Sequence, residues 1–219
     1  MTDWRVLSSA RRTSYCPVAL LLRDDFTGGG AISPPQLWLE RKVGAAWLPT
    51  GIAAVRTSGS IYGWPGLGRA IDPATAPAAD VRVRIQLAHQ IPLYRATVDG
   101  LEFTVPPYND ANPPTSSPVM PQLVLLEPGP SYPFTPAMRV LRGRVLDPGG
   151  RPVLDALVAA DGTERAMTGP GGGFSLPLRW QAPSGGVTID VTHPRSGMAA
   201  STSATLPADL AQSFDITVS

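Results

Sequence analysis

The chain has 219 residues, too many for one small β-sandwich and enough for two domains of about 100 residues each. Its formal net charge of +1 excludes a strong overall field that would attract nucleic acid or an acidic membrane surface. The single cysteine, Cys16, excludes an intrachain disulfide framework, and the low charged fraction of 16% indicates a surface that partner chains could cover.

Proline and glycine are frequent along the whole chain, with 25 and 22 residues. Since a proline inside a helix costs about 3 kcal/mol, long helices are nearly excluded. The sequence therefore predicts an all-β protein with two β-sandwich domains, a proline-rich connection between them and an N-terminal arm. The predicted ranges are 1–16 for the arm, 17–106 for the first domain, 107–137 for the connection and 138–219 for the second domain.

The first residues form a polar arm that also carries apolar side chains such as Trp4 and Leu7. It is either a disordered tail or an arm that docks on a neighbouring chain. It lacks the apolar segment of a secretory signal, and no apolar run approaches the roughly 20 residues that span a bilayer. Synthesis in a reducing cytoplasm is the simplest expectation.

Short apolar runs separated by turn residues predict the strands of the first domain. Apolar residues alternate with polar ones over 81–87, which predicts a strand with Val81, Val83, Ile85 and Leu87 facing a core. A type I′ hairpin is expected over 94–105, around Asp99-Gly100. Further strands are expected at 17–22, 37–42, 46–49, from 55 onward and at 61–62.

The predicted connection contains many prolines, which favour extended chain and a stiff link. Apolar residues run through it, so a covered linker is favoured over a proline-rich ligand for another domain. Residues 124–126 could form one strand or pack on either domain.

The second domain begins with a strand, a tight turn and a second strand over 141–158. Leu141, Gly143 and Val145 fall on one face of the first strand. Asp147-Pro148-Gly149-Gly150 has the composition of a turn, with positive φ expected at Gly149. Further strands are expected at 166–168, 174–178, 187–192 and 214–218.

The second domain matches a known β-sandwich pattern at Gly143, Val145, Asp147, Gly150, Pro152, Val153, Ala156, Val158, Thr168, Gly173, Phe174 and Leu176. Through these residues it resembles the carboxypeptidase regulatory-like, transthyretin-like family of seven-stranded β-sandwiches. The resemblance covers about 80 residues, and it departs from the family at Asp155, where glycine is more common, and at the turn Gly171-Gly172. It implies a rigid, non-catalytic accessory module of the kind found beside enzymes, on cell surfaces and in phage or phage-like tails. The first domain resembles, loosely, accessory proteins of phage-like contractile loci.

The sequence predicts no catalytic, cofactor or metal site. It has no Gly-x-Ser-x-Gly elbow or phosphate-binding loop, and the glycine run 169–173 is not followed by a helix. His89 and His193 could join Cys16 in a zinc site or a Cys–His pair only by long-range convergence. Asp24, Asp25 and Asp110 could bind calcium, but a carboxylate that caps the turn at Thr27 is the preferred interpretation.

Aromatic residues leave two interpretations open, because Trp38, Trp47, Trp64 and Tyr62 could either pack in a core or interface or form a platform that stacks on a sugar. Trp38 and Trp47 lie in predicted strands and are expected in the core, whereas Trp64 lies in a glycine-rich turn and is expected at the surface. Packing in a core or interface is favoured, and partner or glycan contact through Trp64, Tyr62 and Tyr108 is the alternative.

These observations predict a non-catalytic structural or adaptor component of a multi-chain assembly, plausibly a phage tail or phage-tail-like particle. Its expected partners are other protein chains, not nucleic acid or a membrane. A carbohydrate or cell-surface binding module is the alternative function, and an enzyme with an unrecognised site is a third.

Overall fold

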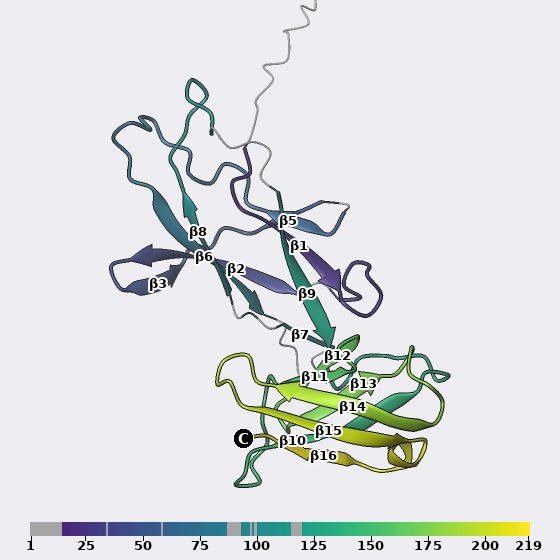
Figure 1. Cartoon of the computed structure of the whole chain (residues 1–219). Coiled ribbons are helices and arrows are strands. Elements are labelled where there is room, and N and C mark those ends of the chain that lie inside the picture. Colours follow the sequence, from purple (N-terminus) through teal and green to yellow (C-terminus); the bar gives the residue numbers. More distant parts are fainter. Residues whose placement is uncertain are drawn as a thin grey trace, which may run out of the picture.

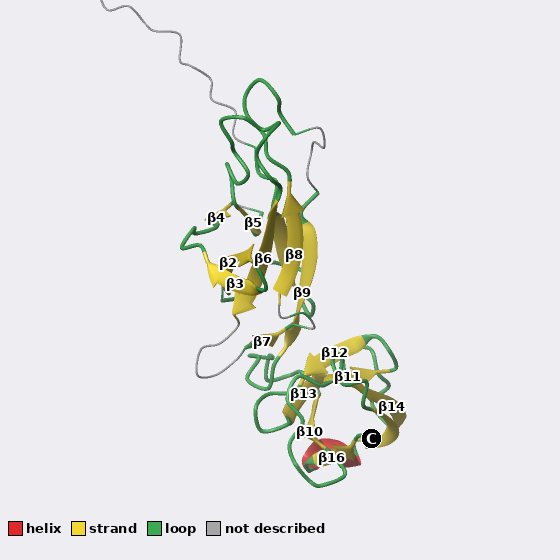
Figure 2. Cartoon of the chain, turned by 90° about the vertical axis from the view of Figure 1, so that its left-hand side faces the viewer, coloured by secondary structure: helices red, strands yellow, loops and turns green. Residues whose placement is uncertain are grey.

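The structure is a computed structural model that describes residues 15–33, 35–57, 59–86, 93–96, 98, 100–114 and 120–219. Apart from a short 3₁₀ helix, η1 (Ala208–Ala211), the regular elements of these residues are strands. The strands form four sheets in two packed pairs (Figures 1 and 2). The predicted all-β fold is confirmed.

Among the described residues, no helix has both the length and the apolar character needed to cross a membrane.

The N-terminal sandwich comprises β1 to β9. Its five-stranded sheet has the order β4-β5-β1-β9-β7, and its four-stranded sheet has the order β3-β2-β6-β8. Val81, Val83 and Ile85 are at most 9% exposed, so the predicted buried face of their strand is confirmed, whereas Leu87 lies outside the described residues. The strands are β1 (Ala19–Asp24), β2 (Gln36–Val43), β3 (Ala46–Pro49), β4 (Val55–Arg56), β5 (Ile61–Gly63), β6 (Ala79–Gln86), β7 (Tyr94–Arg95), β8 (Gly100–Val105) and β9 (Gln122–Pro128).

The proline-rich stretch provides a strand of this sandwich. β9 lies within 107–137 and runs parallel to β1, with Val124 opposite Leu22. Val124 and Leu126 are at most 4% exposed and belong to the buried cluster of the N-terminal sandwich. The sequence leaves open whether residues 124–126 form a strand, and the structure shows that they do. Between β1 and β7 the backbone groups of β9 find hydrogen-bond partners and its apolar side chains are buried.

The predicted hairpin over 94–105 is wrong. β7 pairs with β9, whereas β8 pairs with β6 in the other sheet. Tyr94 is 3% exposed, and its hydroxyl donates a 2.9 Å hydrogen bond to the buried carboxylate of Asp24. Burial of Tyr94 thus outweighs the local turn preference; Asp99, the first residue of the expected turn, lies outside the described residues.

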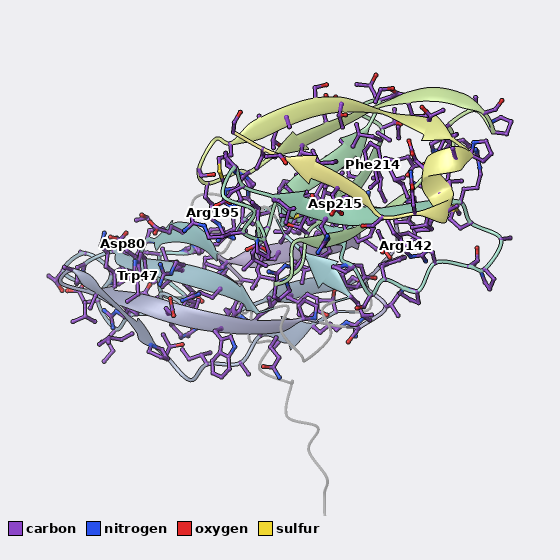
Figure 3. All side chains as sticks on the ribbon, turned by 90° about the horizontal axis from the view of Figure 1, so that it is seen from below. Trp47, Asp80, Arg142, Arg195, Phe214 and Asp215 are labelled. Carbon is purple, nitrogen blue, oxygen red and sulfur yellow. The ribbon has the colours of Figure 1, made fainter. Side chains whose placement is uncertain are left out.

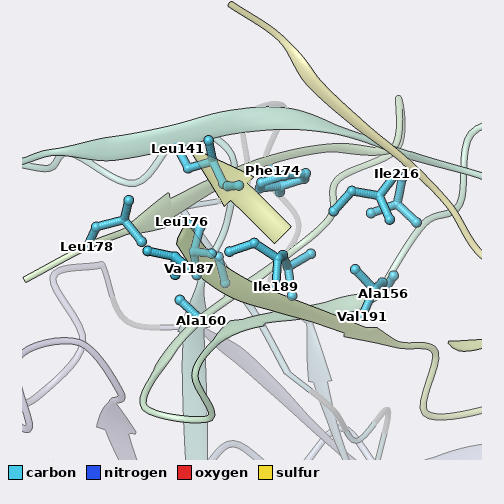
Figure 4. Packing of buried hydrophobic residues seen from close by; sticks show 14 of the residues in the cluster. Leu141, Ala156, Ala160, Phe174, Leu176, Leu178, Val187, Ile189, Val191 and Ile216 are labelled. Atoms are coloured by element: carbon cyan, nitrogen blue, oxygen red, sulfur yellow. The ribbon is translucent and has the colours of Figure 1, made fainter. Parts of the chain in front are cut away.

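The C-terminal sandwich comprises β10 to β16, in a three-stranded sheet of order β13-β10-β16 and a four-stranded sheet of order β12-β11-β14-β15. Apolar side chains from both sheets interdigitate between them (Figure 4). β15 falls on a run of Ala, Ser and Thr that lacks the apolar alternation of the other strands. The strands are β10 (Val140–Leu146), β11 (Leu157–Ala160), β12 (Glu164–Met167), β13 (Gly173–Pro177), β14 (Gly185–Thr192), β15 (Ala199–Leu206) and β16 (Phe214–Thr217).

The turn after β10 joins two different sheets. Asp147 accepts the hydrogen bond from the N–H of Gly150, and the positive φ of 76° lies at Gly150, one residue later than predicted. The next strand is only a bridge between Pro152 and Leu146, after which the chain crosses to β11. The predicted inner face of β10 is confirmed, since Leu141 and Val145 are fully buried.

Gly143 allows β10 to lie close to β16. A Cβ atom at this position would lie 1.9 Å from the carbonyl oxygen of Phe214, which is closer than any nonbonded contact permits. The two strands run parallel with Gly143 opposite Phe214. Glycine is therefore required at this point of the C-terminal sandwich.

Candidate functional site

The three aromatic residues predicted to contact a partner or glycan are buried. Trp64, Tyr62 and Tyr108 are 1%, 7% and 1% exposed, so the predicted surface position of Trp64 is wrong. The glycine-rich turn folds inward, and the Trp64 indole N–H donates to the Ile52 carbonyl at 3.2 Å. As these side chains lie, they present no surface to a sugar ring.

The other two tryptophans of this region lie on the outer face of the four-stranded sheet, which corrects their predicted core position. Leu39 is 2% exposed and faces the core, so its neighbour Trp38 points the other way and is 49% exposed. Trp47 lies beneath the guanidinium of Arg82, 4.8 Å from the ring centroid, and Lys42 lies 5.7 Å from the same ring. The period-two alternation of Leu37, Trp38 and Leu39 contained this signal.

A hollow of about 380 Å³ lies on this outer face. Trp38 on β2 lies opposite Arg84 on β6. Two residues further along β2, on the same face, Glu40 lies opposite Arg82. Arg82 donates to Oε2 of Glu40 from Nε at 2.8 Å and from Nη2 at 2.5 Å. Figure 3 shows Trp47 and Asp80 on the strands of this sheet, whereas Phe214 and Asp215 belong to the C-terminal sandwich. The hollow is lined by Trp38, Glu40, Pro49, Arg84 and Ile85.

A second hollow of about 550 Å³ lies at the end of the same sheet, beside the loop 67–77. Its described lining is apolar apart from Thr50, Arg41 and Arg69, and no described residue that lines it is a carboxylate, histidine or cysteine. Acid–base catalysis needs a proton-transferring side chain within reach of the substrate. Among the described residues that line this hollow, none is of a type that usually transfers a proton at neutral pH.

Asp24 caps the turn that follows β1, as preferred from the sequence. The carboxylate is fully buried and accepts hydrogen bonds from the backbone N–H groups of Phe26 and Thr27 and from the hydroxyls of Tyr94 and Tyr132. Burial, followed by the contact with Asp24, raises the pKa of Tyr94 to about 12. These four donors occupy the oxygens that a calcium ion would need.

The other two aspartates of the calcium alternative lie elsewhere. Asp110 pairs with Arg69, and Asp25 pairs with Arg165 of the C-terminal sandwich. Within the described part of the chain, no three His, Cys, Asp or Glu side chains are grouped as they would be around a metal ion.

The junction between the two sandwiches contains several partly buried ion pairs, its anchors, and Asp25 forms the first of them. Arg165 of β12 donates to Asp25 through Nη2 at 2.5 Å and Nε at 3.1 Å. This two-point geometry fixes the orientation of both planar groups. The side chain of Asp25 is 14% exposed, so little water competes for the pair.

Arg179 is the second anchor. It binds Glu164, whose side chain is 1% exposed, with Nε 3.0 Å from Oε1. Its Nη1 donates to the carbonyl oxygen of Phe26, and its guanidinium carbon lies 4.0 Å from the centroid of the Phe26 ring. Arg179 thus binds a carboxylate of its own sandwich, and it also contacts a backbone carbonyl and an aromatic ring of the N-terminal sandwich.

Asp155 is the third anchor. Its carboxylate binds Arg95 of β7 at 2.5 Å and Arg195 at 2.8 Å. Asp155 has a φ of 61°, in the left-handed region that favours glycine. The aspartate at this position therefore supplies a carboxylate that joins the two sandwiches.

Glu127 is buried beside these ion pairs without one of its own. It is 2% exposed, and its Oε2 atom has no hydrogen-bond partner among the described residues. Burial, reinforced by the negative charge of Asp25 and opposed by Arg165, raises the pKa of Glu127 to about 7. The junction therefore contains a carboxyl group that titrates near neutral pH.

Cys16 and His193 lie in different sandwiches and do not form a pair. The Cys16 thiol donates to the carbonyl oxygen of Val18, and burial raises its pKa. His193 bonds to Leu154 and Ser196 in the loop after β14. His89 lies outside the described residues.

No known protein family and no curated protein matches this chain. One solved structure is similar, the Bacillus anthracis TIE protein, with 12% sequence identity and a TM-score of 0.30. The similarity covers 93% of this chain and 33% of the TIE protein, so the chain spans about a third of that protein's length. A TM-score this low carries no argument about function.

Proposed function

We propose that this protein is a non-catalytic adaptor that holds two β-sandwiches at a defined orientation within a multi-chain assembly such as a phage-tail-like particle. The observation that supports it best is the junction, where Asp25–Arg165, Glu164–Arg179–Phe26 and Arg95–Asp155–Arg195 all join or brace the two sandwiches.

The fixed orientation has a physical cause. Burying a charged group costs several kcal/mol unless it is paired, and removing one partner leaves the other charge uncompensated. Pulling the two sandwiches apart would break both the Asp25–Arg165 pair and the Arg95–Asp155 pair. The junction therefore favours a single arrangement over a range of arrangements, as an adaptor requires.

An open strand edge supports assembly with other chains. β15 is an eight-residue edge strand without proline, lysine or any other charged residue. Ser219 pairs with Ala199 at one end, and Asp209 accepts from the Thr205 N–H at the other. By alternation, the backbone groups of Ser201 and Ser203 point toward the same open edge. Natural proteins usually block such edges, so an unblocked one suits pairing with a partner strand.

The C-terminal sandwich is further proposed to be a carboxypeptidase regulatory-like module. The close approach at Gly143 and the left-handed conformation of Asp155, where that family more often has glycine, support this assignment. Such a module would contribute rigidity and a contact surface, not catalysis. For the location, we propose that the protein is made in the cytoplasm and then incorporated into a particle.

Sedimentation of the tagged, full-length protein from its native host tests the proposal. We expect it to sediment with a large particle and to co-purify with a repeating protein subunit. A matched variant, Ser201→Pro, removes one backbone donor at the open edge of β15 and is expected to reduce this association, whereas Ser213→Pro lies outside β15 and serves as the control. Sedimentation only as a 23.1 kDa monomer would contradict the proposal.

A further inference from the structure

The outer face of the sheet β3-β2-β6-β8 has the groups of a small-ligand site. Trp38 exposes about half of its surface, 49%, beside a hollow of about 380 Å³. Pockets for small molecules begin at about 300 Å³, so the hollow has room for one ring of a ligand and its substituents. An exposed indole face is apolar and flat, which matches the C–H face of a pyranose ring.

A fixed polar pair lies next to Trp38. Arg82 and Glu40 are hydrogen-bonded, with side chains 26% and 13% exposed, and Trp47 packs against the Arg82 guanidinium. Both hydrogen bonds end on Oε2 of Glu40, so among the described residues Oε1 accepts none. Oε1 can accept from one sugar hydroxyl while the guanidinium donates to its neighbour. Because the pair is already ordered, little side-chain entropy is lost on binding.

Arg84 adds a positive charge to this face. It lies opposite Trp38 in the β2–β6 pairing and lines the hollow. Over the described ranges, no carboxylate pairs with Arg84. The Arg82–Glu40 pair is neutral as a whole, so Arg84 is the uncompensated charge among the described residues that line the hollow.

The composition of the face argues for a small ligand and against a protein. The outward side chains of β2, β6 and β8 include Glu40, Lys42, Asp80, Arg82 and Glu102, and charged residues are depleted at the centres of protein interfaces. A flat ring with hydroxyl groups and one negative charge matches the set better than an apolar protein patch does.

We propose that the face around Trp38 and Arg84 binds a saccharide that carries a carboxylate, such as a uronic or sialic acid. In this arrangement Trp38 stacks on the sugar ring, the Arg82–Glu40 pair binds hydroxyl groups, and Arg84 binds the carboxylate. The site is separate from the junction, so it does not depend on the adaptor function and goes beyond it.

A printed array of sialylated, uronate-containing and neutral oligosaccharides tests the proposal with the full-length protein. We expect binding to acidic members of the array and weaker binding to neutral ones. Trp38→Ala should weaken binding about tenfold or more through loss of the stacking surface. Arg84→Gln should remove the preference for acidic over neutral members.

The chain contains a matched control. Trp180 belongs to the C-terminal sandwich, is 75% exposed and does not line the hollow. Trp180→Ala should leave binding unchanged. Absence of binding to every acidic oligosaccharide, binding that survives Trp38→Ala, or equal loss in both tryptophan variants would each overturn the proposal.

Discussion

Replacing Glu127 by glutamine tests the electrostatics of the junction most directly. Glu127 is buried beside Asp25 and Arg165, and its pKa is raised from 4.5 to about 7. Glu127→Gln keeps the size and shape of the side chain and removes the titrating proton. We expect the variant to be more stable than the wild-type protein above neutral pH and about equally stable in mild acid.

The magnitude follows from the difference between the folded and unfolded pKa. Between about pH 4.5 and about pH 7 the folded protein retains a proton that the unfolded chain has released, so the free energy of unfolding falls as the pH rises. Above about pH 7 both states are ionised and the loss is complete. The pKa difference corresponds to about 3 kcal/mol, because one pKa unit is about 1.4 kcal/mol.

Urea unfolding of both proteins at about pH 5 and about pH 8 measures this difference. Asp147 and Asp215, whose pKa values are lowered by hydrogen bonds from Arg151 and Arg144 respectively, titrate in both proteins, so their contributions cancel in the comparison. A carbon-detected NMR titration of the Glu127 carboxyl gives its pKa directly. A stability difference that does not change with pH, or a measured pKa near 4.5, would refute the reasoning.

Three further changes test the fold and the junction. Gly143→Ala should destabilise the C-terminal sandwich by more than about 4 kcal/mol, because its Cβ would overlap the backbone of β16. The control Gly171→Ala, with open space around it, should change stability by less than about 0.5 kcal/mol. Thermal unfolding that gives similar values for both variants would contradict the structure. Arg165→Gln should weaken the coupling of the sandwiches by about 2 kcal/mol. Small-angle X-ray scattering should then show a wider range of maximum dimensions for the single protein, and an unchanged profile would count against a fixed junction. Asp155→Asn keeps a residue that tolerates positive φ but removes the charge between its two arginines, so it should cost about 3 kcal/mol, measured by urea unfolding; a neutral effect would mean that the ion pairs contribute nothing.

Several strands could be predicted from local pattern because backbone preference and burial act over only a few residues. The alternation of Val81, Val83 and Ile85 identified both a strand and its buried face. The composition of the turn at Asp147 likewise placed the end of β10. In both cases the signal lies within ten residues of the structure that it describes.

The tryptophans show where residue type alone misled. A large aromatic side chain is expected to fill a core, yet Trp38 faces outward because Leu37 and Leu39 occupy the inner face of the same strand. Trp64 is buried although its turn is rich in glycine. Alternation within the strand was the better guide to Trp38, whereas nothing near Trp64 in the sequence indicated its burial.

By itself, the sequence determined that the chain is all-β, that proline excludes long helices and where many strands begin and end, because these properties depend on local backbone conformation. Only the tertiary structure decided which strands pair and which charges meet. Tyr94 leaves its expected hairpin to bind Asp24, 70 residues earlier, and Arg165 binds Asp25 across 140 residues. Such contacts depend on burial and pairing that form only when distant segments pack together, so no local pattern encodes them.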